Sequence, residues 1–329
     1  MAAFLHILDA LLPGKSVRSD QPEKKRPTIG LALSSGGAKG LAHIGVIQVL
    51  EENGIEVEAI AGTSMGAYVG GLWASGLHGK ELEGLAAAMT SGRERWSLVD
   101  PVLPPRRGFI RGKKILARLR ETLGDKQFSE LEKPFVAIAT EFETLERAVL
   151  ESGEVATAIQ ASLAVPGVVV PVMREGIEYI DGGVCDPLPV RILKEKFEVD
   201  AVIAVNVLPP IGSLRNHKNK EIPRRWKRSM QAVNRHINYF APGNLLDILR
   251  GAAMGSQMRL VSRSARSADV LISAISVETG WHDYHRFDHY IEVGRKAAED
   301  ALPKILALLN TGDPAPDSGD TKPELANCA

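Results

Sequence analysis

The sequence is poor in cysteine, in net charge and in long apolar runs. It has two cysteines, Cys185 and Cys328, among 329 residues, too few for a disulfide framework, so we expect a reducing, cytoplasmic environment. Lys and Arg together number 40, as do Asp and Glu, and this balance excludes a whole-molecule field that would attract nucleic acid. No apolar run reaches the roughly 18 residues that a membrane-spanning helix needs.

The composition divides the chain into three parts. Residues 1–27 hold an N-terminal apolar segment and a polar linker, residues 28–310 are expected to form the main domain, and the polar, proline-rich residues 311–329 are expected to be a disordered tail. Residues 209–260 are predicted to form a basic helical insertion in the domain. The helical spacing of Phe4, Ile7, Leu8 and Leu11 favours docking on the protein's own surface, with an interfacial membrane anchor as the alternative.

Strand and helix signals alternate from Thr28 onwards. Helices are predicted over 42–53 and 67–75, and β-rich apolar runs cover 28–33, 59–61, 135–140, 168–172, 201–207 and 270–273. Alternating strands and helices pair in parallel through crossover connections. The sequence therefore predicts a three-layer α/β/α sandwich with a mainly parallel central sheet.

Residues 59–67 have the form of a nucleophile elbow, in which a strand turns sharply into a helix and exposes a serine. Gly62 and Gly66 flank Ser64 at the two positions where so tight a turn leaves no room for a side chain. The positive end of the helix that follows Ser64 favours an oxyanion. An ordinary Gly/Ser turn is the alternative, but the position between a strand and a helix favours a serine nucleophile.

The glycine-rich turn at 34–40 is a second strand-to-helix connection, and its backbone N–H groups suit an oxyanion hole. A phosphate cradle is the competing interpretation. However, Lys39 is followed by Gly40 and not by Ser or Thr, which breaks the P-loop pattern, and no dinucleotide fingerprint is present. We therefore expect no nucleotide or other cofactor.

A serine nucleophile needs a base, and the residues alone leave two choices. The segment 281–289 contains His282, His285 and His289, and a histidine there would complete a Ser, Asp, His order of the α/β-hydrolase type. Asp181 is the other candidate, in an Asp-Gly-Gly turn that could equally be a simple turn. The spaced histidines match no ligand motif, so no metal site is predicted.

The turn at 35–40, the elbow at 62–66 and the Asp-Gly-Gly at 181–183, in this order, together resemble the bacterial patatin-like phospholipases. The stretches 158–167 and 186–191 look like the same family, so the resemblance covers roughly residues 29–207. It implies a Ser-Asp dyad in place of a triad, with Ser64 as nucleophile and Asp181 as general base. The resemblance also implies an oxyanion hole at Gly36, Gly37 and Ala38, supported by Lys39, Gly62 and Gly66. Ser35 departs from the family pattern, which has glycine there.

This resemblance implies a lipid acyl-ester hydrolase, of phospholipase A or lysophospholipase type, that works through an acyl-serine intermediate. For an aspartate to act as the base, burial must raise its pKa above the usual value of about 4. Acyl transfer, or a non-catalytic lipid- or partner-binding regulator on the same fold, are the alternatives. Basic residues at 215–235 and 106–120 suggest peripheral contact with an anionic membrane, and a solvated helix face is the other interpretation.

Overall fold

The computed structural model describes residues 26–88, 98–212, 245–276 and 283–311. Its centre is one mixed sheet in which neighbouring strands follow the order β5-β6-β3-β2-β1-β7-β8, and β4 also pairs with β3. The strands are Ile29–Leu33 (β1), Ala59–Thr63 (β2), Phe135–Glu141 (β3), Arg147–Leu150 (β4), Val172–Arg174 (β5), Ile177–Asp181 (β6), Ala201–Asn206 (β7) and Val270–Ser273 (β8).

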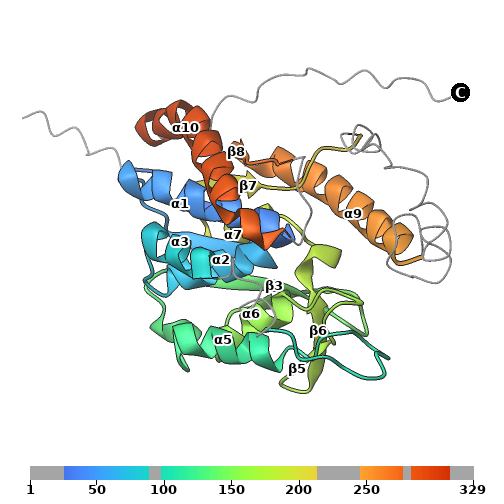
Figure 1. Ribbon diagram of the computed structural model, residues 1–329. Coiled ribbons are helices and arrows are strands. Elements are labelled where there is room, and N and C mark those ends of the chain that lie inside the picture. The colour runs from blue at the N-terminus through green and yellow to red at the C-terminus, as the bar shows by residue number, and fades with distance from the viewer. Residues whose placement is uncertain (1–25, 89–97, 213–244, 277–282, 312–329) are drawn as a thin grey trace, which may run out of the picture.

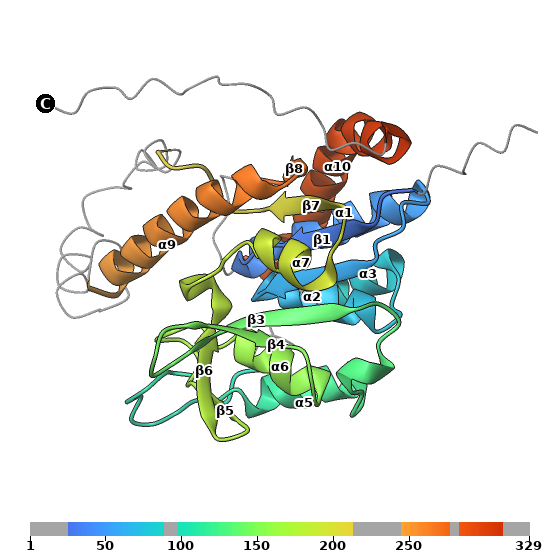
Figure 2. The ribbon, with the colours of Figure 1, turned by 180° about the vertical axis from the view of Figure 1, so that it is seen from behind.

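Helices lie on both faces of this sheet. The α-helices are Ala42–Glu52 (α1), Met65–Ala74 (α2), Gly79–Ala88 (α3), Lys113–Leu123 (α5), Val155–Ser162 (α6), Val190–Phe197 (α7), Leu245–Ser264 (α9) and Phe287–Thr311 (α10). Short 3₁₀-helices are Gly37–Leu41 (η1), Phe128–Glu130 (η2), Gly182–Val184 (η3), Ala265–Ser267 (η5) and Tyr284–Arg286 (η6). Figure 1 shows α1, α2, α3 and α10 in front of the sheet, and Figure 2 shows α7 and α9 on the opposite side.

The strands β3, β2, β1, β7 and β8 run parallel, whereas β4, β5 and β6 are antiparallel to their neighbours. Parallel strands need covered faces and crossover connections, and here helices supply both. The predicted three-layer α/β/α sandwich with a mainly parallel sheet is confirmed.

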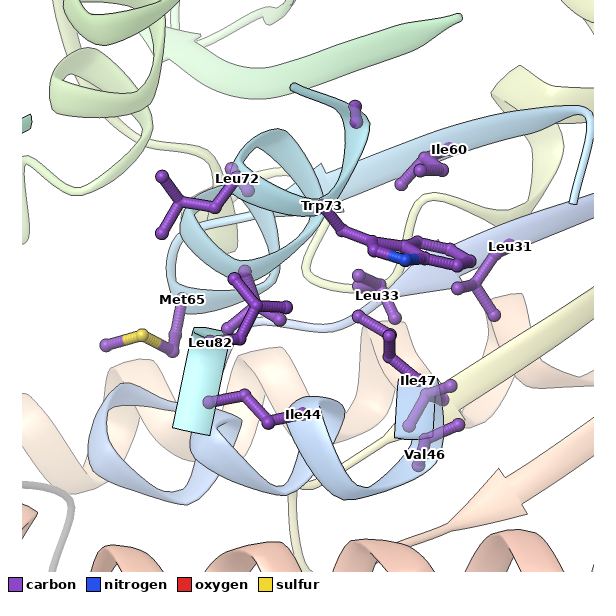
Figure 3. Close-up of a cluster of buried hydrophobic side chains, with 14 of the residues drawn as sticks. Leu31, Leu33, Ile44, Val46, Ile47, Ile60, Met65, Leu72, Trp73 and Leu82 are labelled. Atoms are coloured by element: carbon purple, nitrogen blue, oxygen red, sulfur yellow. The ribbon is translucent and has the colours of Figure 1, made fainter. Parts of the chain in front are cut away.

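Side chains of the parallel strands alternate between two cores. Leu31 and Leu33 of β1 face the larger core, whereas Ala32 between them faces the smaller one. In Figure 3 the two leucines and Ile60 of β2 lie around the ring of Trp73 of α2. The smaller core lies under α7 and is lined on the sheet side by small residues, among them Ala32, Ala59, Ala61 and Ala204. These small side chains let α7 pack closely on the sheet.

One predicted strand is wrong over most of its length. The apolar run 168–172 was expected to be β-structure, but β5 begins only at Val172, and Val169 forms a single isolated bridge with Ile110. The chain turns at Gly167, whose φ is +77°, and Val168 O then accepts the N–H groups of Phe109 and Ile110. The valines therefore pack against this loop and do not form a strand.

Several expectations concern residues outside the described ranges. They include the apolar segment and linker before residue 26, the tail from residue 312, and the basic side chains between 215 and 235. The described end of the expected insertion, α9, is helical. None of the helices in the described ranges combines the length and apolarity needed to cross a membrane.

Candidate active site

Two strand ends meet along one edge of β3. β2 pairs with β3 in parallel and places Thr63 opposite Ile138. β6 pairs with it antiparallel and places Asp181 opposite Ala139, the next residue along. Since β4 pairs with both of these β3 residues, it occupies the other edge, and β2 and β6 must share this one. Their carboxyl ends therefore point at each other, which places Ser64, the residue after β2, beside Asp181.

The backbone at Ser64 is sharply bent. Its φ of 55° and ψ of −119° are unusual for a residue with a side chain, and such strain persists only where the surroundings enforce it. A Cβ on Gly62 would lie 2.4 Å from Gly66 O, and a Cβ on Gly66 would lie 2.3 Å from Leu33 O. Glycine is thus required at both positions, for the steric reason that the elbow motif predicts.

Ser64 and Asp181 form a direct hydrogen bond in a buried site. Ser64 Oγ donates to Asp181 Oδ2 at 2.5 Å, and Gly183 N donates to Asp181 Oδ1 at 2.7 Å. Each of the two side chains is only 5% exposed. Burial raises the pKa of Asp181 to about 6, although the hydrogen bonds from Ser64 and Gly183 act to lower it. This carboxylate is therefore a stronger base than an aspartate in water.

The glycine-rich turn packs against the start of α2. A Cβ on Gly40 would lie 2.5 Å from Met65 Cγ, and one on Gly36 would lie 2.3 Å from Val207 Cγ2. Gly37 has a φ of +57°, in the left-handed region that favours glycine. The turn leads into η1, and the first N–H groups of a helix have no acceptor within it. Gly40 thus places the turn beside the start of α2, and the oxyanion hole at Gly36, Gly37 and Ala38 stays a prediction.

Ser35, where the resemblance expects glycine, is accommodated without backbone strain. Its φ is not positive, and its N–H donates to Pro187 O at 2.9 Å. The side chain is 3% exposed, and its Oγ has no hydrogen-bond partner. The departure from the family pattern therefore adds a buried hydroxyl and requires no positive φ at this residue.

Lys39 is buried, with only 7% of its surface exposed. Its Nζ donates to Ser276 O at 2.7 Å, across 237 positions of sequence. Burial lowers the pKa of Lys39, and the charge of Asp283 acts in the opposite direction. Lys39 thus ties the glycine-rich turn to the segment that follows β8.

The patatin-like phospholipase family model matches residues 31–194, a range that includes the elbow, the glycine-rich turn and the Asp-Gly-Gly turn. The chain belongs to the patatin-like phospholipase family through this domain. The expected resemblance to that family is confirmed.

Proteins with NTE in their names are among the relatives of this chain. An uncharacterized NTE family protein of Mycobacterium tuberculosis is 35% identical over 222 residues, which is 67% of this chain and 61% of the relative. Lysophospholipase NTE1 of Pyricularia oryzae is 27% identical over 288 residues, 84% of this chain and 18% of the relative. The chain thus spans about three fifths of the mycobacterial relative and under a fifth of the fungal one.

Among solved structures, VipD from Legionella pneumophila matches with a TM-score of 0.42 and 16% identity, over 84% of this chain and 67% of VipD. ExoU from Pseudomonas aeruginosa, in complex with SpcU, matches with a TM-score of 0.41 and 13% identity, over 87% of this chain and 53% of that chain.

In this patatin-like domain no described histidine hydrogen-bonds to Ser64 or Asp181. His43 is completely buried, its Nε2 lies 2.8 Å from Ser34 O, and burial lowers its pKa to about 4. His289 Nε2 lies 3.1 Å from Ser276 Oγ, and His282 lies outside the described ranges. The geometry therefore favours the Ser-Asp pair over a triad.

Sequence reasoning missed three side chains near this pair. Burial raises the pKa of Tyr284 to about 12, and the nearby charge of Asp181 adds to the increase, so this tyrosine lies within electrostatic range of Asp181. A Cβ on Gly183 would lie 2.8 Å from Gln257 Nε2 of α9. Ser162 accepts the N–H of Ser64. Ser162 lies in the family-like stretch 158–167, but nothing in that stretch indicates its contact.

The described residues contain no group of three or more His, Cys, Asp and Glu side chains that could hold a metal ion. The chemistry that these residues support is nucleophilic attack by a serine on a polarised carbonyl, with a neighbouring carboxylate as the proton acceptor.

Proposed function

We propose that the protein is a lipid acyl-ester hydrolase in which Ser64 is the nucleophile and Asp181 the general base. The observation that carries this proposal is the 2.5 Å hydrogen bond from Ser64 Oγ to Asp181 Oδ2, at the junction of β2 and α2. A general base must lie within hydrogen-bond reach of the proton that it removes. Membership of the patatin-like phospholipase family supports lipid esters as the substrate class.

Acylation begins when Ser64 Oγ attacks the ester carbonyl carbon and its proton passes to Asp181 Oδ2. The carbonyl oxygen becomes an oxyanion, which the N–H groups of Gly36, Gly37 and Ala38 and the N-terminal end of α2 stabilise. Collapse of this intermediate expels the alcohol, which takes the proton from Asp181, and leaves acyl-Ser64. Asp181 then deprotonates a water molecule that attacks the acyl carbonyl and releases the fatty acid.

The environment of Asp181 fits both halves of this cycle. With a pKa of about 6, the carboxylate is ionised at neutral pH and able to accept a proton, and its protonated form is acidic enough to return that proton to the leaving alcohol. An aspartate with an unperturbed pKa of about 4 would hold the serine proton far less well. The hydrogen bond from Gly183 keeps Oδ1 occupied and leaves Oδ2 for Ser64.

Lysophospholipids are the first substrates to test, because the fungal relatives are named lysophospholipases.

Peripheral contact with an anionic membrane is a separate part of this proposal. Within 106–120, Arg106, Arg107, Lys113 and Arg120 are all exposed. Arg107 pairs with Glu178 and Arg120 pairs with Glu154. Co-sedimentation with vesicles tests it: binding should increase with anionic lipid content and decrease with salt.

The decisive experiment incubates the purified protein with a mixed lipid extract and identifies the lipids that disappear and the fatty acids released. The wild type should consume acyl esters, and Ser64→Ala and Asp181→Asn should not. A serine-directed phosphonate should label the wild type and leave Ser64→Ala unlabelled. Labelling of Ser64→Ala, or near-normal turnover by Asp181→Asn, would overturn the proposal. Products formed with an added alcohol acceptor distinguish acyl transfer from hydrolysis.

A further inference from the structure

The main chain of Ser64 is held by a side chain from a different part of the fold. Ser64 N donates to Ser162 Oγ at 2.8 Å, and Ser162 Oγ in turn donates to Ile138 O at 2.6 Å. Ser162 is the last residue of α6 and is completely buried. Its hydroxyl therefore links three elements, the elbow after β2, the end of α6 and the middle of β3.

We propose that Ser162 is a positioning residue, which keeps Ser64 in the bent conformation that aims its Oγ at Asp181. This inference rests on the proposed function of that pair. Ser64 has a φ of 55° and a ψ of −119°, which side-chain-bearing residues rarely adopt, so the conformation needs an external support. Ser64 follows the last residue of β2, and its N–H donates to the Ser162 hydroxyl, which supplies this support.

The end of α6 also holds the other member of the pair. Asp181 N donates to Ala164 O at 2.9 Å, two residues after the serine that binds Ser64 N. Ser162 bonds to Ile138, and Asp181 pairs with the adjacent Ala139. The segment 162–164 is thus hydrogen-bonded to both reacting residues and to β3, the strand on which the carboxyl ends of β2 and β6 meet. A shift of this segment would change the distance between Ser64 Oγ and Asp181 Oδ2.

A buried serine hydroxyl at the far end of α2 supplies a matched comparison. Ser75 is 5% exposed, and its Oγ donates to Leu72 O at 2.7 Å. Like Ser162, it is a buried serine at the end of a helix with a hydroxyl bonded to a main-chain carbonyl. Unlike Ser162, it has no contact with the elbow. A difference between alanine variants at the two positions therefore separates positioning from general stability.

The test measures kcat and KM with a soluble ester, the rate of phosphonate labelling, and the midpoint of thermal unfolding. Ser162→Ala should lower kcat about 100-fold, the loss expected when a reacting group is displaced by about 1 Å, and should leave KM within about threefold. Ser162→Thr, which keeps the hydroxyl, should restore most of kcat. Ser75→Ala should lower the midpoint of thermal unfolding by about as much as Ser162→Ala does, and it should leave kcat unchanged.

Two further readouts respond to positioning but not to stability alone. The hydrogen bond from Ser64 holds down the pKa of Asp181, so Ser162→Ala should move the acid limb of the pH–rate profile upwards. Amide hydrogen exchange at Ser64 should also accelerate, whether or not an assay substrate has been found. If Ser162→Ala retains kcat within about threefold, or if exchange at Ser64 is unchanged, the inference is wrong. An inactive wild type with accelerated exchange in Ser162→Ala would instead contradict the proposed function and leave the positioning contact supported.

Discussion

Ser64 and Asp181 are 117 positions apart in the sequence, yet their side chains share a 2.5 Å hydrogen bond. The contact exists because β2 and β6 approach β3 from opposite directions and end at consecutive residues, Ile138 and Ala139. The pair is buried, and burial is also what raises the pKa of Asp181 to about 6. Activity and stability should therefore both depend on pH in ways that can be measured.

The value of kcat/KM should fall as the pH decreases through about 6. Proton transfer from Ser64 requires an ionised Asp181, so activity should approach a tenfold loss for each pH unit below the inflection. The measurement is hydrolysis of a soluble ester between pH 4.5 and pH 8.5, about the range in which a pKa near 6 is well bracketed. An inflection near pH 4, the value for an aspartate in water, would contradict the assigned environment.

Asp181→Asn should make the folded protein more stable at neutral pH while it abolishes turnover. The folded protein keeps a proton on Asp181 up to a pH of about 6, whereas the unfolded chain releases it near 3.8. Between these values the folded state binds more protons, so the ionisation of Asp181 lowers stability as the pH rises. Above pH 6 the accumulated cost is on the order of 3 kcal/mol, and asparagine does not incur it.

The corresponding measurement is urea unfolding of wild type and Asp181→Asn at about pH 7.5 and pH 4, on either side of the titration. The stability gain should be present at the higher pH and nearly absent at the lower one. Asp125→Asn, at an exposed position, is the control for a lost carboxylate. Equal stability of Asp181→Asn and wild type at the higher pH would show that the carboxylate is not destabilised by burial.

Gly62→Ala should disrupt the elbow, whereas the same change at Gly84 should not. A Cβ at Gly62 would lie 2.4 Å from Gly66 O, but one at Gly84 of α3 would meet nothing within 4 Å. We expect Gly62→Ala to lose at least about 2 kcal/mol of stability and at least about 100-fold in kcat. Gly84→Ala should gain about 0.5–1 kcal/mol from helix propensity. Thermal unfolding followed by circular dichroism measures the stability of both variants, and ester turnover measures their kcat. An active Gly62→Ala enzyme would refute the steric argument.

Ser35→Ala should leave stability unchanged or raise it by up to about 1 kcal/mol, because the hydroxyl it removes is buried and unpartnered. Turnover should remain close to that of the wild type, since the N–H of residue 35 still donates to Pro187 O. Chemical unfolding and kcat/KM test the two statements separately. A tenfold loss of kcat/KM with unchanged stability would mean that the hydroxyl contacts substrate.

The elbow could be predicted from sequence because its geometry is local. Gly62, Ser64 and Gly66 specify the turn within five residues, and the flanking apolar runs indicate a strand and a helix. The strand predicted at 168–172 failed because an apolar run shows that residues are buried but not what covers them. Val169 is buried on the loop around Ile110, a contact between segments far apart in sequence.

By itself, the sequence determined the parallel α/β architecture, the serine at a strand-to-helix turn and, through family resemblance, Asp181 as the expected base. The tertiary structure alone decided that β2 and β6 end side by side on β3, that Lys39 is buried against Ser276, and that Ser162 holds the main chain of Ser64. The physical reason is that periodicity and turn chemistry act over a few residues. Strand register and hydrogen bonds across 98 positions or more arise only when the whole sheet has assembled.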